Sequence, residues 1–291
     1  MINKLKKKEL LNIDKEKSSA LNPLKTINEE IFSFADVKQK EIDELKKLEV
    51  FRKEFIADIS HELKTPIFAA QGFVHTLLDG AVNDKAVRTR FLKKAAKSLD
   101  GLDALVQDLL TLSQIETGQI KMQFETVDLY KLTEEVFEQF EGKANKKDVS
   151  LRIEGESKKF LVHADWQRMS QVMTNLISNA IKHSHDEGEV IVTFEQSKKY
   201  ITASVRDFGE GIPVDHQTRI FERFYRVDKS RSREKGGTGL GLAIVKHILD
   251  GHNTKAEVES EPGKGSTFKF RLPRIKIESA ETRESIKSEK S

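Results

Sequence analysis

Residues Ser60-His61-Glu62-Leu63-Lys64-Thr65-Pro66 place an imidazole, a carboxylate and a proline within one amphipathic helix. The apolar residues of this helix recur every three or four positions: Leu48, Phe51, Phe55, Ile59 and Leu63. At about 100° per residue, His61 lies roughly 200° around the helix from Ile59, so its side chain should face solvent. Pro66 removes one backbone donor, and the helix should bend there and then continue. An exposed imidazole beside a carboxylate is a candidate nucleophile.

The segments on either side of this helix predict a helical hairpin. Residues 1–36 are polar, with Pro23 as a break, and a charged signal-input helix at 37–54 leads into the histidine helix. After a connection at 80–85, a second helix repeats apolar residues in steps of three and four: Leu92, Ala95, Leu99, Leu102, Val106 and Leu109. One hairpin leaves half of each apolar seam in water, whereas two hairpins bury both seams in a four-helix bundle. The sequence therefore predicts a homodimer, with this bundle at 55–120.

Beyond Gly118 the pattern becomes that of an α/β domain, which we place at 121–274. Helices are predicted at 131–143, 166–183 and 239–250, and strands at 149–153, 189–195, 200–206, 255–259 and 267–272. The last two strands should pair antiparallel, because Glu261-Pro262-Gly263-Lys264-Gly265 forms a tight connection between them. Residues 275–291 lack apolar periodicity and are predicted to be a disordered tail. The predicted fold class is α+β, with a helical hairpin followed by an α/β sandwich.

One helix and one strand end of this domain carry groups suited to a nucleotide. Asn175 and Asn179 share a helix face, with Lys182 and His183 one turn further on. Amide oxygens suit magnesium, and an ammonium group suits phosphate. Asp207-Phe208-Gly209-Glu210-Gly211 ends a strand, where glycines admit a flat ring and the aspartate can accept a hydrogen bond from an exocyclic amine.

A glycine-rich segment, Gly236 to Leu242, leads directly into a helix, so its N–H groups should attract phosphate. Its spacing differs from both the dinucleotide fingerprint and the P-loop, and the run Gly263 to Thr267 also lacks P-loop spacing. A basic stretch before it could close over a triphosphate as a lid: Arg226, Lys229, Arg231, Arg233 and Lys235. The order of these segments after a histidine hairpin indicates a nucleotide-binding domain.

Composition narrows the class of protein. The chain has 291 residues, of which 37% are hydrophobic and 33% charged, and this describes two soluble domains. A net charge of +3 provides no overall field for nucleic acid, and the absence of cysteine excludes disulfides and thiolate zinc sites. No run of eighteen apolar residues is present, and the start at Lys4 to Lys8 lacks the apolar part of a secretory signal. This basic start is either a juxtamembrane stub or a solvated terminus.

Over residues of about 45–274, the chain closely resembles the sensor histidine kinases of two-component systems. Five ordered boxes carry the resemblance: Phe55 to Ile67 with His61, Asn175 to His183, Asp207 to Gly211, Phe221 to Tyr225, and Gly237 to Gly241. Two departures are His252-Asn253, where the family often has glycines, and His183, where an aromatic residue is common. The resemblance implies a dimerisation and phosphotransfer hairpin followed by an ATP-binding domain of the Bergerat type.

The resemblance also implies a mechanism. The γ-phosphoryl of ATP would pass to His61, with Glu62 holding the other ring nitrogen, and then to an aspartate of a response-regulator receiver domain. Thr65 would position water for the reverse phosphatase reaction. Mg²⁺ would bind Asn179 and Asn175, and adenine would be read by Asp207. The implied nucleotide-binding residues are Asn175, Asn179, Lys182, His183, Asp207, Gly209, Gly211, Phe221, Phe224, Arg226, Gly237, Thr238, Gly239, Leu240, Gly241 and Thr267. Such a chain would act on the cytoplasmic side of the inner membrane, attached through segments outside this sequence.

Other interpretations use the same residues differently. His61-Glu62 begins like an HExxH zinc motif, but the fifth position is Thr65, which disfavours a metalloprotease. A catalytically silent dimeric scaffold would have no reason to combine His61 with Asn179, Asp207 and the glycines. An ATP-driven conformational machine, like the gyrase or chaperone relatives, would share the nucleotide pocket but would lack the histidine hairpin.

Overall fold

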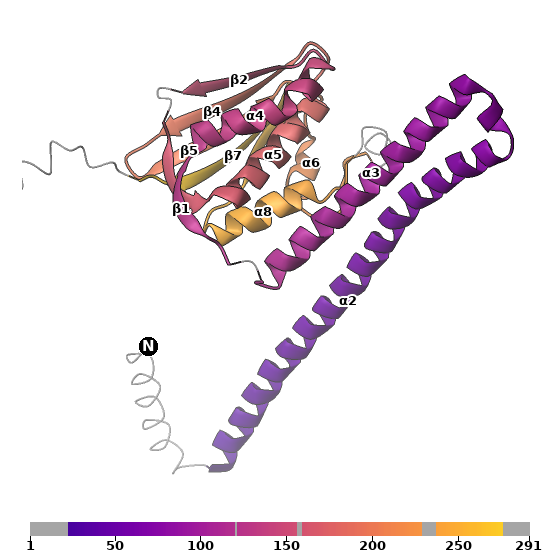
Figure 1. Cartoon of the computed structure of the whole chain (residues 1–291). Helices are drawn as coiled ribbons and strands as arrows, with labels where there is room; N and C mark the ends of the chain where they lie inside the picture. The colour runs from indigo at the N-terminus through magenta and orange to yellow at the C-terminus, as the bar shows by residue number, and fades with distance from the viewer. Residues whose placement is uncertain (1–22, 120, 156–158, 229–236, 276–291) are drawn as a thin grey trace, which may run out of the picture. The chain divides into compact units, whose positions relative to one another are not determined.

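The computed structural model describes residues 23–119, 121–155, 159–228 and 237–275 (Figure 1). The chain divides into two compact units, Met1–Glu62 and Leu63–Ser291. Within the described ranges, no helix is both long and apolar enough to cross a membrane. The predicted disordered tail lies outside the described residues except for Ile275, whose N–H donates to the carbonyl of Leu161 at 2.9 Å.

Helix α2 spans Pro23–Leu78, so the prediction of a helix beginning at Val37 was wrong by fourteen residues. Pro23 was taken as a break, but it occupies the first helical position, where its missing N–H costs nothing and its fixed φ favours the helix. The helix continues through Pro66, as predicted. Every side chain described between residues 27 and 54 is exposed, because this part of the described chain is a single helix.

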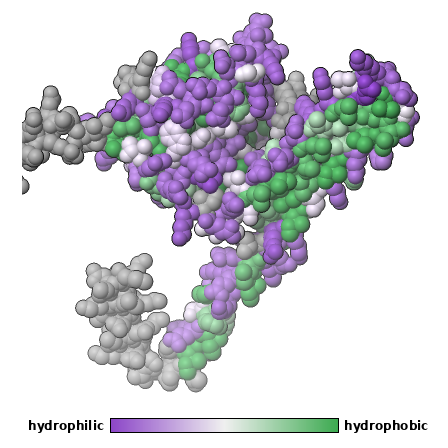
Figure 2. Space-filling view, viewed as in Figure 1, coloured by the Kyte–Doolittle hydropathy of each residue, from purple (hydrophilic) through white to green (hydrophobic). Residues whose placement is uncertain are grey.

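Helix α3 spans Lys85–Glu116 and follows a short 3₁₀ turn, η1, at Ala81–Asn83. Its start is set by Asp84, whose side chain accepts from the N–H groups of Ala86 at 2.9 Å and Val87 at 3.1 Å. The apolar residues predicted to form the seam of α3 are partly buried and partly exposed in the structure. Ala95 is buried within this unit, whereas Leu92 and Leu99 remain 53% and 54% exposed. Figure 2 shows apolar side chains gathered along the helical hairpin.

The α/β domain contains a mixed five-stranded sheet in the order β2-β4-β5-β7-β6, and only β2 and β4 pair in parallel. Its strands are β2 (Ser150–Gly155), β4 (Glu189–Gln196), β5 (Tyr200–Asp207), β6 (Glu257–Glu261) and β7 (Gly265–Pro273). Helices α4 (Leu129–Asn145), α5 (Trp166–His183) and α8 (Gly241–Gly251) cover one face of the sheet (Figure 1). The predicted two-domain α+β fold is confirmed, as is the antiparallel pairing of the last two strands.

Three short elements of the α/β domain were not predicted. Strands β1 (Phe124–Asp128) and β3 (Leu161–Asp165) form a separate antiparallel pair, and α6 (Val214–Gln217) is a single turn. The two strands pair across helix α4 and strand β2, so no local pattern marks them, and one helical turn is too short to show a period. The pair nevertheless contributes to the core, since Val127 and Val162 are fully buried.

The core lies between α5, α8 and the sheet. Helix α5 begins at Trp166 because Asp165 accepts a hydrogen bond from the N–H of Arg168 at 3.0 Å. Its buried face consists of Met169, Val172, Met173, Leu176, Ile177, Ala180 and Ile181. Alternate residues of β5 complete this core, as predicted from their period of two, whereas in β4 Ile191 is buried together with Val190 and Val192. The other face of α5, which carries Asn175 and Asn179, does not belong to this core.

The end of α8 explains the departure from the glycines that are common in the family. Asn253 has a φ of 56°, in the left-handed region that asparagine tolerates better than most residues. His252 is 5% exposed, its Nε2 accepts from the N–H of Asp165 at 3.0 Å, and its Nδ1 lies 2.8 Å from the carbonyl oxygen of Ile248. Burial lowers the pKa of His252, opposed by its bond to Ile248. The neutral ring thereby joins the ends of α8 and β3.

Candidate functional site

His61 projects from α2 with its side chain 67% exposed, as the spacing predicts. The side chain of Glu62 is only 20% exposed, and its Oε1 lies 3.8 Å from Nδ1 of His61. This distance is too long for the hydrogen bond expected between the two atoms. The physical reason is that neighbouring residues on a helix point about 100° apart and do not face each other. Thr65, one turn later, is half-buried.

The outer face of α5 presents the predicted polar residues. Asn175, Asn179, Lys182 and His183 are all half-buried, while the residues between them fill the core. Lys182 and His183 lie in the last turn of the helix. The predicted grouping on one helix face is therefore present.

Asp207 ends β5 and is 3% exposed. Burial raises the pKa of its carboxyl, whereas hydrogen bonds from the N–H groups of Gly209, at 3.0 Å, and Ser266 act in the opposite direction. Gly209 is required next to it, because a Cβ there would lie 1.9 Å from the carbonyl oxygen of His183. Gly211 has a φ of 68°, and a Cβ on it would lie 2.1 Å from the carbonyl oxygen of Glu261. The strand end is thus packed directly against the end of α5.

The glycine segment contacts the same face of α5 at two predicted residues, Lys182 and Asn175. A Cβ on Gly237 would lie 2.3 Å from Nζ of Lys182, and a Cβ on Gly241 would lie 2.9 Å from Oδ1 of Asn175. Leu240, directly before α8, is fully buried and fixes the start of that helix. The structure therefore brings amide and ammonium groups of α5 to the positive end of α8.

The predicted aromatic box supports the glycine segment from its other side. The N–H of Phe224 donates to the carbonyl of Gly239 at 2.9 Å, and both residues have positive φ, 58° and 74°. Arg226 Nη2 donates to the carbonyl of Gly237 at 2.6 Å. Phe221 packs edge-on against Phe268 with ring centroids 6.4 Å apart. The contacts of Phe224 and Arg226 hold this part of the chain against the glycine segment.

Two predictions stand apart from these contacts. The rest of the predicted lid, including Lys229, Arg231, Arg233 and Lys235, lies outside the described residues. Thr267 is a half-buried residue of β7 that pairs in register with Arg206 of β5, one residue before Asp207. Its position is close to the strand end along the sheet, but no contact with the other predicted residues defines a role for it here.

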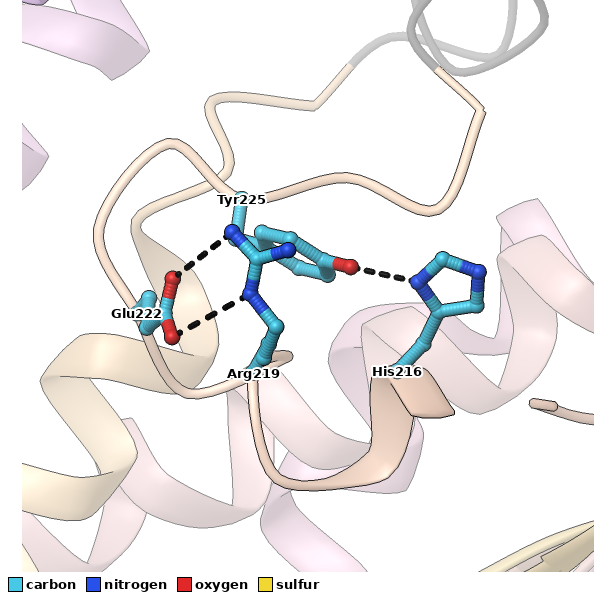
Figure 3. Close-up of polar contacts among 4 residues, drawn as sticks. All are labelled: His216, Arg219, Glu222 and Tyr225. Carbon is cyan, nitrogen blue, oxygen red and sulfur yellow. Dashed lines mark hydrogen bonds and ion pairs between the residues drawn. The ribbon is translucent and has the colours of Figure 1, made fainter. Parts of the chain in front are cut away.

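A polar cluster holds the turn that precedes the aromatic box in place (Figure 3). The ring Nδ1 of His216 and the hydroxyl of Tyr225 form a hydrogen bond. The guanidinium of Arg219 lies 4.4 Å from the centroid of the Tyr225 ring, and its Nε is 3.4 Å from Oε1 of Glu222. A cation over an aromatic face is attracted to the ring quadrupole. The cluster fixes the chain between α6 and Arg226.

Helix α3 contributes contacts that sequence reasoning missed. The hydroxyl of Thr238 donates to Oδ2 of Asp108 at 2.6 Å, and burial raises the pKa of this carboxyl while the hydrogen bond lowers it. Glu116 pairs with Arg223 and lies 3.2 Å from Nε2 of His247. No local pattern could have revealed these pairs, because Asp108 and Thr238 are 130 residues apart.

The acidic end of α3 also borders an open hollow of about 480 Å³. Its lining residues are Ile115, Glu116, Met122, Arg223, His247 and Gly251. None of the predicted nucleotide-binding residues lines it, so it is separate from the site built on α5.

The donor set on α5 suits magnesium better than zinc or iron. Among the described residues, no cluster of three or more His, Cys, Asp or Glu side chains could hold a metal by itself. Two amide oxygens on one helix face are hard ligands, and Mg²⁺ commonly completes such a shell with phosphate oxygens and water. The residues therefore fit a magnesium ion that arrives together with phosphates.

Two family models match the sequence. Residues 51–118 match the His Kinase A (phospho-acceptor) domain, and residues 164–276 match the histidine kinase-, DNA gyrase B- and HSP90-like ATPase. The first match contains His61, and the second contains the polar face of α5, the end of β5 and the glycine segment. Both halves of the predicted architecture thus have a matching model.

Known proteins resemble the chain over most of its length. It is 34% identical over 235 residues to the sensor histidine kinase WalK of Bacillus subtilis, covering 80% of this chain but 38% of WalK. The chain thus spans well under two thirds of this relative. Histidine kinase ThkA, solved in complex with response regulator protein TrrA, is 26% identical with a TM-score of 0.63, covering 76% of this chain and 61% of that one. Full-length ShkA, solved with AMPPNP, is 28% identical with a TM-score of 0.58, covering 78% and 47%.

Proposed function

This chain belongs to the sensor histidine kinases of two-component systems, and from that premise we propose that it is an ATP-dependent protein histidine kinase. The γ-phosphoryl of ATP is transferred to His61 and then to an aspartate of a response-regulator receiver domain. The reverse phosphatase activity is part of the proposal. ThkA, which was solved in complex with a response regulator protein, supports the choice of partner.

The observation that carries this proposal is the meeting of α5 with the start of α8. Asn175 contacts the position of Gly241, and Lys182 contacts the position of Gly237. Amide oxygens, an ammonium group and the backbone N–H groups of a helix start are thereby gathered at one place, and each of these groups favours a phosphate or its metal ion. A structural role alone would not require three kinds of phosphate-binding group together.

We assign the roles as follows. Asn179 and Asn175 would hold Mg²⁺, which supplies positive charge to the phosphates. Lys182, Arg226 and the segment Gly237 to Gly241 would bind the phosphates through ammonium, guanidinium and backbone N–H groups. Asp207 would accept a hydrogen bond from the exocyclic amine of adenine, since a buried ionised carboxylate is only an acceptor.

His61 would attack the γ-phosphorus through a neutral ring nitrogen, and the bond between that phosphorus and the ADP oxygen would break. An exposed ring is accessible for this reaction. Glu62 would orient the ring once its Oε1 closes the 3.8 Å gap to Nδ1, which a rotation of either side chain can achieve. Thr65 would position a water molecule for the phosphatase reaction.

The hairpin supports a homodimer. Leu92, Leu99 and Val106 recur every seven residues on α3, and they remain 53%, 54% and 38% exposed. A second hairpin would bury this stripe in a four-helix bundle. We propose domain boundaries of 55–120 for the hairpin and 121–274 for the ATP-binding domain. Following the family, we place the chain on the cytoplasmic side of a membrane and attach it through segments outside this sequence.

The proposal is tested by incubating the protein with γ-labelled ATP and magnesium. Wild-type protein should acquire an acid-labile, alkali-stable label that His61→Gln abolishes, while His61→Gln still binds a non-hydrolysable ATP analogue. Labelled protein should then pass the phosphoryl to a receiver domain. Label that survives His61→Gln would refute the assigned acceptor. ATP hydrolysis with no protein label would instead favour the ATP-driven machine.

A further inference from the structure

Lys147, in the connection between α4 and β2, belongs to none of the five boxes. Its ammonium nitrogen donates to the carbonyl oxygens of Ile181 at 3.0 Å, Lys182 at 3.1 Å, and Ser184. These carbonyls end α5, where the last C=O groups of a helix have no partner within the helix. Three acceptors match the three donors of an ammonium group, and a cation also favours the negative end of the helix dipole. One half-buried side chain therefore caps the helix that carries the asparagines.

The backbone on both sides of this contact is held in an unusual conformation. Asp148 has a φ of 54° and Glu187 a φ of 60°, and neither is glycine. The carbonyl of Lys147 accepts from the N–H of Glu187 at 3.3 Å, so the two loops are joined through backbone as well as side chain. Residues with positive φ are retained only where the surrounding contacts hold them there. Both side-chain and backbone hydrogen bonds therefore hold Lys147 at the end of α5.

The end of α5 is in turn in contact with both predicted halves of the nucleotide site. The carbonyl of His183 packs against Gly209, beside Asp207, and the ammonium of Lys182 packs against Gly237. A Cβ on Gly209 would clash with the backbone of His183, and a Cβ on Gly237 would displace the ammonium of Lys182. A shift of the last turn of α5 would therefore move the adenine end and the phosphate end together.

Lys147 also acts on Asp207 through its charge. Burial raises the pKa of this carboxyl, while the amides of Gly209 and Ser266 and the charges of His185 and Lys147 lower it. Removing the ammonium would leave a buried carboxylate with less positive charge around it. The pKa of the carboxyl would then rise further, and a protonated carboxyl donates a hydrogen bond as well as accepting one.

We propose that Lys147 is a positioning residue for nucleotide binding, which caps the end of α5 and so holds both ends of the nucleotide site in place without touching the nucleotide. The inference rests on the proposed function, because it assigns Asp207 to adenine. It predicts that loss of the ammonium weakens ATP binding and also reduces the preference for ATP over GTP. Guanine carries a carbonyl oxygen where adenine carries the amine, so only a protonated Asp207 can donate to it.

The test compares Lys147→Met, Lys147→Gln and Lys147→Arg in the full chain, with Lys146→Met as the matched control. Lys146 is the exposed neighbour at the end of α4. Dissociation constants for ATP and GTP analogues with magnesium are measured by calorimetry between pH 5.5 and 8. We expect Lys147→Met to weaken ATP binding by about 10-fold, which corresponds to about 1.4 kcal/mol, and Lys147→Arg to restore it to within about 3-fold.

The pH profile separates positioning from general stability. In Lys147→Met and Lys147→Gln the pH at which ATP binding is lost on acidification should rise, and in Lys147→Arg it should stay at the wild-type value. Titration of the phosphates themselves cancels in the comparison with Lys146→Met. A loss of folding alone would lower affinity without moving this midpoint.

The outcomes are distinguishable. If the wild type and Lys146→Met bind ATP and Lys147→Met binds it equally with the same midpoint and base preference, the role of Lys147 is refuted while the proposed function stands. If the wild type binds no adenine nucleotide, the proposed function itself fails. Should Lys147→Met not fold, Lys147→Gln and Lys147→Arg decide, because equal midpoints in these two variants would overturn the proposal.

Discussion

Replacing Gly241 with alanine should separate the stability of the protein from its ability to bind nucleotide. Gly241 is the first residue of α8, and its φ does not lie in the left-handed region, so alanine fits the backbone. The added Cβ would lie 2.9 Å from Oδ1 and 3.4 Å from Cγ of Asn175, with no backbone atom among its nearest neighbours. The substitution therefore displaces one side chain, that of Asn175.

The two effects have opposite signs. Alanine favours a helix over glycine by up to about 1 kcal/mol, so the free energy of unfolding should stay the same or rise slightly. Ordinary contact begins at 3.4 Å, so the amide of Asn175 must move by about 0.5 Å. Loss of one hydrogen bond or ligand contact costs about 1–1.5 kcal/mol, which weakens nucleotide binding by roughly 10-fold.

The assay measures urea unfolding and calorimetric binding of an ATP analogue with magnesium, for the wild type, Gly241→Ala and a control variant. Gly142→Ala in α4 is the control, because a Cβ at that position meets nothing within 4 Å. It should gain similar stability and bind nucleotide normally. Wild-type affinity in Gly241→Ala would refute a role for the position of Asn175. A loss of stability above about 1 kcal/mol would show that the displaced amide cannot relax.

Other predictions concern the fold and the dimer. Because burial lowers the pKa of His252, the unfolded chain binds that proton more tightly, so stability from the neutral ring is complete above a pH of about 6.5 and falls below it. His252→Gln should therefore flatten the fall in urea midpoint between pH 7.5 and 5.5, and an unchanged slope would contradict this. Thr238→Val removes the hydroxyl bonded to Asp108, and the half-buried carboxylate left behind should cost about 1–3 kcal/mol in urea unfolding at pH 7.5. Leu99→Glu should leave the fold intact but shift sedimentation toward the monomer, since it places a charge on the exposed stripe; a dimer of undiminished strength would remove this stripe from the interface.

Local patterns predicted most of the elements of the α/β domain. The bounds of α5 were predicted without error, and those of β4 and β5 to within one residue, because long periodic segments carry a strong signal. Pro23 was misjudged because proline both breaks helices and begins them, and the sequence alone does not distinguish the two cases. The strands β1 and β3 were missed because their pairing joins segments that are separated by a whole helix.

The candidate site divides in the same way. The residue types along α5 and the glycine spacing indicated phosphate binding, because each motif is a short run whose chemistry depends on local geometry. Which glycine meets which side chain could not be predicted, since Gly237 and Lys182 lie on separate segments. The hydrogen bond expected between His61 and Glu62 is not formed in this structure, where Nδ1 and Oε1 lie 3.8 Å apart because the helix directs adjacent side chains apart.

The sequence by itself determined the family, the helix and strand pattern, and the chemistry of the residues that meet the nucleotide in our proposal. Those properties follow from the identity and spacing of neighbouring residues. Only the tertiary structure revealed that Lys147 caps α5, that Asp108 holds Thr238, and that His252 joins α8 to β3. Each of these contacts joins residues that are at least 34 positions apart. They depend on how packed elements bring distant segments together, and no periodicity in the chain encodes that distance.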